Sequence, residues 1–135
     1  MIFVDAAAIV AILGDEPEAR RCAAGLLAST HPFTSPVAVW EAVVALARAD
    51  RLGLSVEETS KIVGLFLDEN GIELRQLPPP ADVVALSTDA AHRYRSGRQR
   101  LNLADCFHYA CARYYGVPVL STGDEFRFTD LEVVP

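Results

Sequence analysis

The sequence has 135 residues, with 12 Lys and Arg against 18 Asp and Glu, and its formal net charge at pH 7 is −6. Half of the residues are hydrophobic (51%), which excludes a disordered chain, and the length is typical of one compact domain, which we expect over residues 1–135. The acidic balance argues against a DNA-coating protein, but it does not exclude an enzyme that acts on nucleic acid.

The cellular compartment is indicated by three features. No apolar run approaches the roughly 18–20 residues of a membrane span. The start, Met1–Asp5, has no basic segment and reaches an acid at its fifth residue, unlike a signal peptide. Cys22, Cys106 and Cys111 are an odd number without metal-binding spacing. We therefore expect a reduced protein in the cytoplasm, without membrane association.

Strands and helices alternate in the first half of the chain. The predicted elements are a strand over 2–4, helices over 6–13 and 18–28, an extended segment over 33–35 and a helix over 37–49. Ser35 and Pro36 suit the start of that last helix, because a serine oxygen can accept a bond from the first turn and proline has no N–H to satisfy there.

The alternation continues in the second half. The predicted elements are a helix opened by the Ser55/Glu58 capping box and closed by Gly71, a strand over 73–77, helices over 82–94 and 103–115, and strands over 117–120 and 131–134. Asn102 is the predicted cap of the helix over 103–115, whose apolar stripe is Leu103, Phe107, Ala110, Cys111 and Tyr114. Strands separated by helices predict a mostly parallel α/β sheet covered by helices on both faces.

Four acidic residues are candidates for a functional site. Asp5 directly follows the first predicted strand, and Asp124 comes four residues after Leu120. Such positions lie at the carboxyl ends of strands, where function collects in open parallel sheets. Glu41 lies in the second turn of its helix, and Asp105 is the third residue of the helix capped by Asn102.

Asp5 and Asp105 interrupt apolar runs, where a charge costs several kcal/mol unless it is paired or binds a metal ion. Converging carboxylates repel one another, and a divalent cation removes that conflict. Oxygen ligands suit Mg²⁺, for which Mn²⁺ can substitute, and such ions activate water for phosphodiester hydrolysis. Taken singly, Asp105 also suits a helix start, Glu41 a solvated helix face and Asp124 a turn.

Four stretches, in this order, resemble one known family. They are Ile2–Ile9 with Asp5, the helix with Glu41, Leu101–Ala110 with Asp105, and Val119–Phe126 with Asp124. The third, Leu-Asn-Leu-Ala-Asp-Cys-Phe-His-Tyr-Ala, is the most specific. Together they resemble the PIN-domain ribonucleases, most closely the VapC toxins of bacterial toxin–antitoxin pairs, over essentially the whole chain.

The resemblance implies a three-layer PIN-like fold and a Mg²⁺-dependent endoribonuclease toxin. It implies that Asp5, Glu41 and Asp105 hold the ion and the attacking water, and that a small VapB-like antitoxin neutralises the protein. It also suggests a homodimer. Two departures stand out: Ala7 replaces a usual hydroxyl residue, and either Asp124 or Glu125 can be the fourth acid, with Asp124 favoured for its shorter reach.

Arginines cluster just before the helix of Asp105. Arg93, Arg95, Arg98 and Arg100 fall within eight residues, with Tyr94 among them. In a ribonuclease this segment would contact RNA phosphates, with Arg98 and Arg100 the chief candidates. Alternatively, these cations complement the dipole of a solvated helix end.

A second function is compatible with the same residues. It is a non-catalytic binding module with an acidic metal pocket, either a degenerate PIN domain or a receiver-like domain. Ala7 is the feature that favours the degenerate form. The receiver-like form expects adjacent acids near the start and a late lysine, whereas Asp5 stands alone and Lys61 is in mid-chain.

Overall fold

The computed structural model describes residues 1–97 and 100–134. Its strands are β1 (Ile2–Val4), β2 (Pro32–Thr34), β3 (Glu73–Leu74), β4 (Val119–Leu120) and β5 (Val133–Val134). Its helices are α1 (Ala6–Leu13), α2 (Ala19–Ala28), α3 (Pro36–Leu46), α4 (Val56–Glu69), α5 (Pro80–Tyr94), α6 (Leu103–Tyr115) and the short 3₁₀ helix η1 (Glu125–Phe128).

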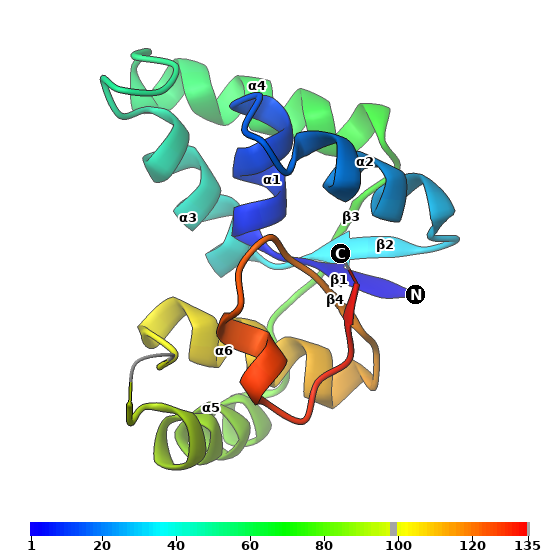
Figure 1. Cartoon of the computed structure of the whole chain (residues 1–135), viewed down its shortest axis with the longest axis vertical. Helices are drawn as coiled ribbons and strands as arrows, with labels where there is room; N and C mark the ends of the chain where they lie inside the picture. Colours follow the sequence, from blue (N-terminus) through cyan, green and yellow to red (C-terminus); the bar gives the residue numbers. More distant parts are fainter. Residues whose placement is uncertain (98–99, 135) are drawn as a thin grey trace.

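The strands form one sheet in the order β3-β2-β1-β4-β5, and each neighbouring pair runs parallel. In Figure 1, α1 to α4 lie on one side of this sheet and α5 and α6 on the other. The predicted three-layer α/β architecture is therefore confirmed. Because β1 is the central strand, the residue that follows it reaches the middle of the sheet's carboxyl edge.

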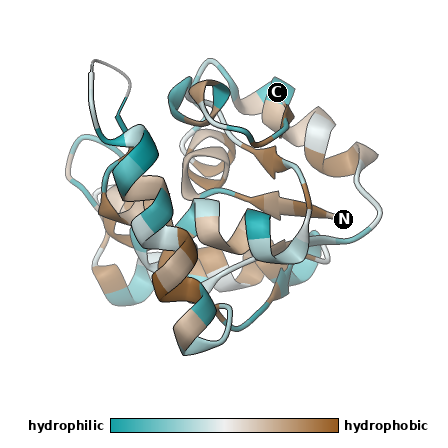
Figure 2. Cartoon of the chain, turned by 90° about the horizontal axis from the view of Figure 1, so that it is seen from below, coloured by the Kyte–Doolittle hydropathy of each residue, from teal (hydrophilic) through white to brown (hydrophobic). Residues whose placement is uncertain are grey.

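The core lies between the sheet and both helical layers. Figure 2 shows hydrophobic strands at the centre of the molecule, surrounded by helices whose outer residues are more hydrophilic. Phe3, Phe33, Tyr109 and Phe126 are among its largest fully buried side chains. The rings of Phe3 and Phe33 meet edge to face with centroids 5.7 Å apart, which joins β1 to β2. No helix among the described residues is long and apolar enough to cross a membrane.

The helices agree with the predicted ranges at most ends. Helices α1 and α6 have the predicted bounds, but α3 ends at Leu46 rather than at Ala49. The chain reverses there, because the Leu52 N–H donates to the Leu46 carbonyl and Gly53 adopts a positive φ of 64°. The reversal brings the segment after α3 back toward the start of α2, where Arg51 forms an ion pair with Glu16.

The predicted apolar stripe of α6 is wrong at both of its ends. Leu103 is 71% exposed and Tyr114 is 44% exposed. The buried residues of α6 instead include Cys106, His108 and Tyr109. The helix packs against both α5 and the sheet, so it buries a wider arc than a single stripe describes.

Candidate active site

Asp5 occupies the central position of the site. It follows β1, its N–H donates to the Leu120 carbonyl at 3.0 Å, and its side chain is buried. The pairing of Val4 with Leu120 places Asp5 beside Ser121, whose hydroxyl donates to Asp5 Oδ2 at 2.8 Å. The other carboxylate oxygen, Oδ1, is buried and finds no hydrogen-bond partner in the described part of the chain. Burial raises the pKa of Asp5, against the lowering influence of His108 and Ser121.

Asp105 is fixed by the start of α6. Its N–H donates to Asn102 Oδ1 at 2.8 Å, and its Oδ2 accepts the Asn102 N–H at 2.9 Å, which makes a complete capping box. Burial raises the pKa of Asp105 to about 6, and the charges of Asp5 and Glu41 add to the effect. One carboxylate thus caps a helix and faces two other acids.

Glu41 and His108 complete the inner part of the site. Glu41 comes from the second turn of α3, and 30% of its side chain is exposed. His108 is fully buried on α6, and its Nε2 lies 3.0 Å from Glu41 Oε1 and 3.5 Å from Asp5 Oδ1. Burial lowers the pKa of His108, but the hydrogen bond to Glu41 and the charge of Asp5 together outweigh it, so the pKa is raised.

These acids share one cavity of about 360 Å³. The acidic side chains that line it are Asp5, Glu16, Glu41, Asp105 and Glu125. Ala7 also lines the wall. Asp124, the favoured fourth acid, is not among the lining residues that the structure describes; it is exposed, and its carboxylate lies 3.3 Å from Arg127 Nε. The structure brings Glu125 to the cavity in its place.

The predicted phosphate-contacting arginines are placed only in part. Arg100 is exposed just before α6, and Arg98 lies outside the described residues. A cation that the sequence did not single out, Arg51, lines the cavity and forms an ion pair with Glu16. Arg51 is brought there by the chain reversal after α3.

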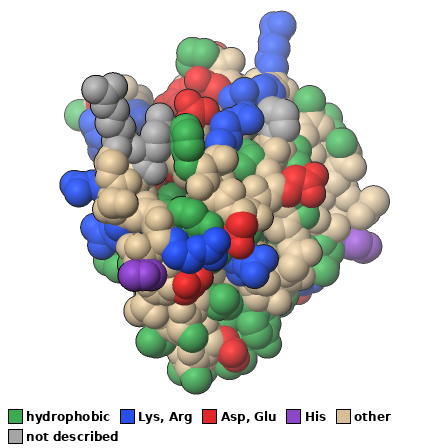
Figure 3. Space-filling model, turned by 60° about the horizontal axis from the view of Figure 1, so that its bottom comes forward, with side chains coloured by type: hydrophobic (Ala, Val, Ile, Leu, Met, Phe, Trp, Pro, Cys, Tyr) green, Lys and Arg blue, Asp and Glu red, His purple; other side chains and the backbone are tan. Residues whose placement is uncertain are grey.

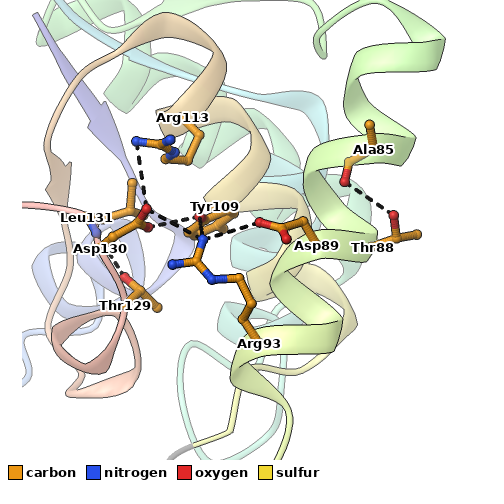
Figure 4. Close-up of polar contacts among 9 residues, drawn as sticks. All are labelled: Ala85, Thr88, Asp89, Arg93, Tyr109, Arg113, Thr129, Asp130 and Leu131. Atoms are coloured by element: carbon orange, nitrogen blue, oxygen red, sulfur yellow. Dashed lines mark hydrogen bonds and ion pairs between the residues drawn. The ribbon is translucent and has the colours of Figure 1, made fainter.

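Arg93 takes part in a network of ion pairs and hydrogen bonds. Its Nη1 lies 3.3 Å from Asp89 Oδ2 and 3.6 Å from Asp130 Oδ2, and it donates to the Tyr109 hydroxyl at 3.3 Å. The Tyr109 hydroxyl donates to Asp130 Oδ1 at 2.8 Å, and Arg113 faces the same carboxylate (Figure 4). This network joins α5, α6 and the segment before β5, away from the cavity lining.

The residues present fit a divalent cation. Among the described residues, Asp5, Glu41 and His108 form a group whose ligand atoms all lie within 4.8 Å of one another, and Asp105 lines the same cavity. The buried, unpartnered Oδ1 of Asp5 would be costly without a positive partner. Clustered carboxylates with raised pKa values have the electrostatic character of a cation site before its ion is bound.

Sequence reasoning did not select two residues at the inner part of this site, Ser121 and His108. The adjacency of β1 and β4 could have indicated Ser121, since it follows its strand as Asp5 follows β1. His108 is three residues after Asp105 on one helix, which is a spacing that places two side chains on the same face. Ser121 also supplies a hydroxyl to Asp5, although Ala7 carries none.

Comparison with known proteins agrees with this fold. The sequence matches the PIN domain family over residues 2–132. It is 33% identical over 133 residues to VapC ribonuclease Mb0640 of Mycobacterium bovis, in an alignment that covers 97% of this chain and 96% of that protein. It is also 34% identical over 142 residues to VapC ribonuclease R02377 of Rhizobium meliloti, in an alignment that covers 97% of this chain and 99% of that protein.

Solved structures show the same fold at low sequence identity. VapC20 of Mycobacterium tuberculosis, described as a Sarcin-Ricin loop cleaving toxin, superposes with a TM-score of 0.77 at 15% identity over the full length of both chains. A chain of VapBC-1 from nontypeable Haemophilus influenzae gives 0.68 at 16% identity, covering 98% of this chain and 96% of that one. The receiver-like alternative is therefore set aside. This chain belongs to the PIN domain family and, within it, to the VapC ribonucleases.

Proposed function

We propose that this protein is a divalent-metal-dependent endoribonuclease toxin that is neutralised by a cognate antitoxin. The observation that carries the proposal is the cavity in which Asp5, Glu41 and Asp105 converge, with one buried Asp5 oxygen that lacks a partner among the described residues. Mg²⁺ is the proposed ion, and Mn²⁺ can substitute. The VapC relatives support the reaction class, because their names describe ribonucleases.

Each side chain of the site has a distinct proposed task. Asp5 and Asp105 would hold the cation, since Ser121 and the α6 cap fix their carboxylates before the ion binds. When bound, a divalent cation supplies an activated water and neutralises charge on the scissile phosphate. Glu41 is more exposed than Asp5, so it can help to hold the ion and accept a proton from water at the cavity mouth. Glu125 is the better placed of the two candidates for the fourth acid.

The proposed partners are an RNA substrate, a small VapB-like antitoxin and a second copy of the chain. Arg98 and Arg100 are proposed to contact RNA phosphates. Exposed apolar side chains on the outer helices, Leu27 on α2 and Trp40 and Val44 on α3, offer surface for the antitoxin or for a homodimer. A solved toxin–antitoxin complex from Klebsiella pneumoniae, one chain of which has this fold with a TM-score of 0.70, supports an antitoxin partner.

The test combines cleavage in vitro with growth in a bacterial host. The purified chain should cleave a structured RNA in the presence of Mg²⁺ or Mn²⁺, and cleavage should stop when EDTA is added. Asp5→Asn should be inactive, because it removes the central carboxylate but keeps an acceptor for Ser121.

In cells, the wild type should arrest growth, Asp5→Asn should not, and co-expression of the neighbouring antitoxin gene should restore growth. Vigorous growth with soluble wild-type protein and no antitoxin would refute the toxin role. Equal cleavage by the wild type and Asp5→Asn would refute the assignment of the site.

A further inference from the structure

His108 does not line the cavity, but it lies directly behind two acids that do, Asp5 and Glu41, and the proposed carboxylate site does not use it. It is 0% exposed on α6, and its Nε2 faces both Glu41 Oε1, at 3.0 Å, and Asp5 Oδ1, at 3.5 Å. Its ring also lies against Phe3 of β1, with centroids 5.8 Å apart, which fixes the direction of the ring. The imidazole is thus held with one nitrogen directed at the acids.

The hydrogen bonds of His108 are unlike those of a purely structural buried histidine. Buried ring nitrogens are normally satisfied by protein groups or ordered water. Nδ1 of His108 is buried and has no partner within the described residues, and Asp5 Oδ1, the atom that Nε2 approaches, has none either. Without an ion, a proton lies between Nε2 and Glu41 Oε1. A cation that binds Nε2 would replace this proton, and Nδ1, which has no partner within the described residues, could carry the proton of the neutral ring instead.

We propose that His108 is itself a ligand of the divalent cation through Nε2, so that the centre has one nitrogen donor beside the carboxylates of Asp5 and Glu41. This inference rests on the cation site of the proposed function and deepens it. The three ligand atoms lie within 4.8 Å of one another, a spread that small side-chain rotations can bring around one ion.

A nitrogen ligand changes which ion the centre prefers. Mg²⁺ is a hard cation that takes oxygen ligands, whereas imidazole binds first-row transition metals well. The centre should therefore bind Mn²⁺ more tightly, relative to Mg²⁺, than an all-oxygen centre would. In most metal sites the second ring nitrogen donates to a protein group, which strengthens the ligand. Nδ1 has no such partner among the described residues, so we expect the Mn²⁺ preference that His108 adds to be smaller than in a site with that partner.

The direct test is pulsed EPR of the whole protein loaded with Mn²⁺. Electron spin echo envelope modulation detects a nitrogen bound to Mn²⁺, and labelling the histidines with ¹⁵N changes the signal only if that nitrogen is an imidazole. The wild type should show histidine modulation, and His108→Gln should lose it. His31→Gln and His92→Gln, which change exposed histidines, should keep it. If His108→Gln does not fold, a histidine signal that persists in both labelled His31→Gln and labelled His92→Gln assigns the ligand to His108.

A second measurement compares affinities by calorimetry for Mg²⁺ and Mn²⁺. The ratio of the Mg²⁺ dissociation constant to the Mn²⁺ dissociation constant should fall in His108→Gln and stay constant in the two control variants. Mn²⁺ binding without histidine modulation, or no Mn²⁺ binding at all, would overturn the inference. RNA cleavage is scored separately: histidine coordination without cleavage would leave the inference standing and refute the nuclease function. RNA cleavage without histidine coordination would refute the inference about His108 and leave the nuclease function standing.

Discussion

At the scale of single residues, Asp105 links the site to folding stability. Burial raises its pKa from an ordinary value near 3.8 to about 6. Between these values the folded state binds more protons at this position than the unfolded state does. The contribution of Asp105 to the stability of the metal-free protein is therefore greatest below pH of about 4 and is lost as the pH rises through about 6.

Asp105→Asn should remove that pH dependence, because the amide keeps the capping acceptor but does not titrate. In EDTA, the variant should gain about 2 kcal/mol or less over the wild type between pH 4 and pH 7, since the carboxyl is partly exposed. Urea unfolding at several pH values measures the difference. Asp68→Asn, at an exposed position on α4, should follow the wild-type curve. Parallel curves for the wild type and Asp105→Asn would contradict the assignment.

Tyr109 provides a prediction that is independent of catalysis. Its buried hydroxyl donates to Asp130 and joins α6 to the segment before β5. Tyr109→Phe should lower the free energy of unfolding by about 1 kcal/mol, because Asp130 keeps Arg113 and Arg93 as partners. Mn²⁺ affinity should not change. Tyr114→Phe on the same helix, where the ring is partly exposed, should have almost no effect; equal losses in both variants would argue against the network.

At the scale of helices, two capping boxes offer a matched comparison. Ser55 and Glu58 begin α4, and Asn102 and Asp105 begin α6 with the same reciprocal bonds. Ser55→Ala and Asn102→Ala should each cost about 1 kcal/mol of stability. Only Asn102→Ala should also weaken Mn²⁺ binding, because its cap orients a carboxylate of the cavity. Thermal unfolding and calorimetry measure the two effects, and weaker binding in both variants would indicate a general loss of folding instead.

The same elements show what could be predicted from sequence. Local signals located α6 at both ends, since Asn102 caps its start and Gly116 takes a left-handed φ of 65° at its end. Asp5 and Asp105 became candidates because they interrupt apolar runs and Asp5 follows a strand. Glu41 became one through its place on a helix and the family resemblance. His108 was not identified, because a histidine inside a helix is ordinary until packing buries it. Its role depends on α6 lying over β1, which no local signal encodes.

The choice between Asp124 and Glu125 could not be made from sequence for a similar reason. Asp124 and Glu125 are neighbours in a short turn, and only the path of η1 decides which one faces the cavity. Arg51 is another long-range case, because a chain reversal of several residues carries it to Glu16. Residues that depend on tertiary packing rather than on a helix cap or strand end are therefore those that sequence reasoning misses.

At the scale of the whole molecule, charge sets a problem for RNA binding. The net charge is −6, and the cavity carries five acids. On the face shown in Figure 3, basic side chains lie in separate groups between acidic ones rather than in one continuous surface. An RNA strand must therefore bind through a few local cations and the bound ion, because the overall field opposes it.

The proposed phosphate contacts predict a specific salt dependence. In an Asp5→Asn background that blocks cleavage, the double variant Arg98→Ala/Arg100→Ala should weaken RNA binding at low salt. It should also reduce the slope of log K against log salt by about 0.7 per lost contact. Arg20→Ala/Arg48→Ala removes the same charge from exposed positions and should leave the slope nearly unchanged. Fluorescence anisotropy from 50 to 300 mM KCl measures both. Identical slopes for the two double variants would mean that net charge, rather than contact by these arginines, governs the binding of RNA.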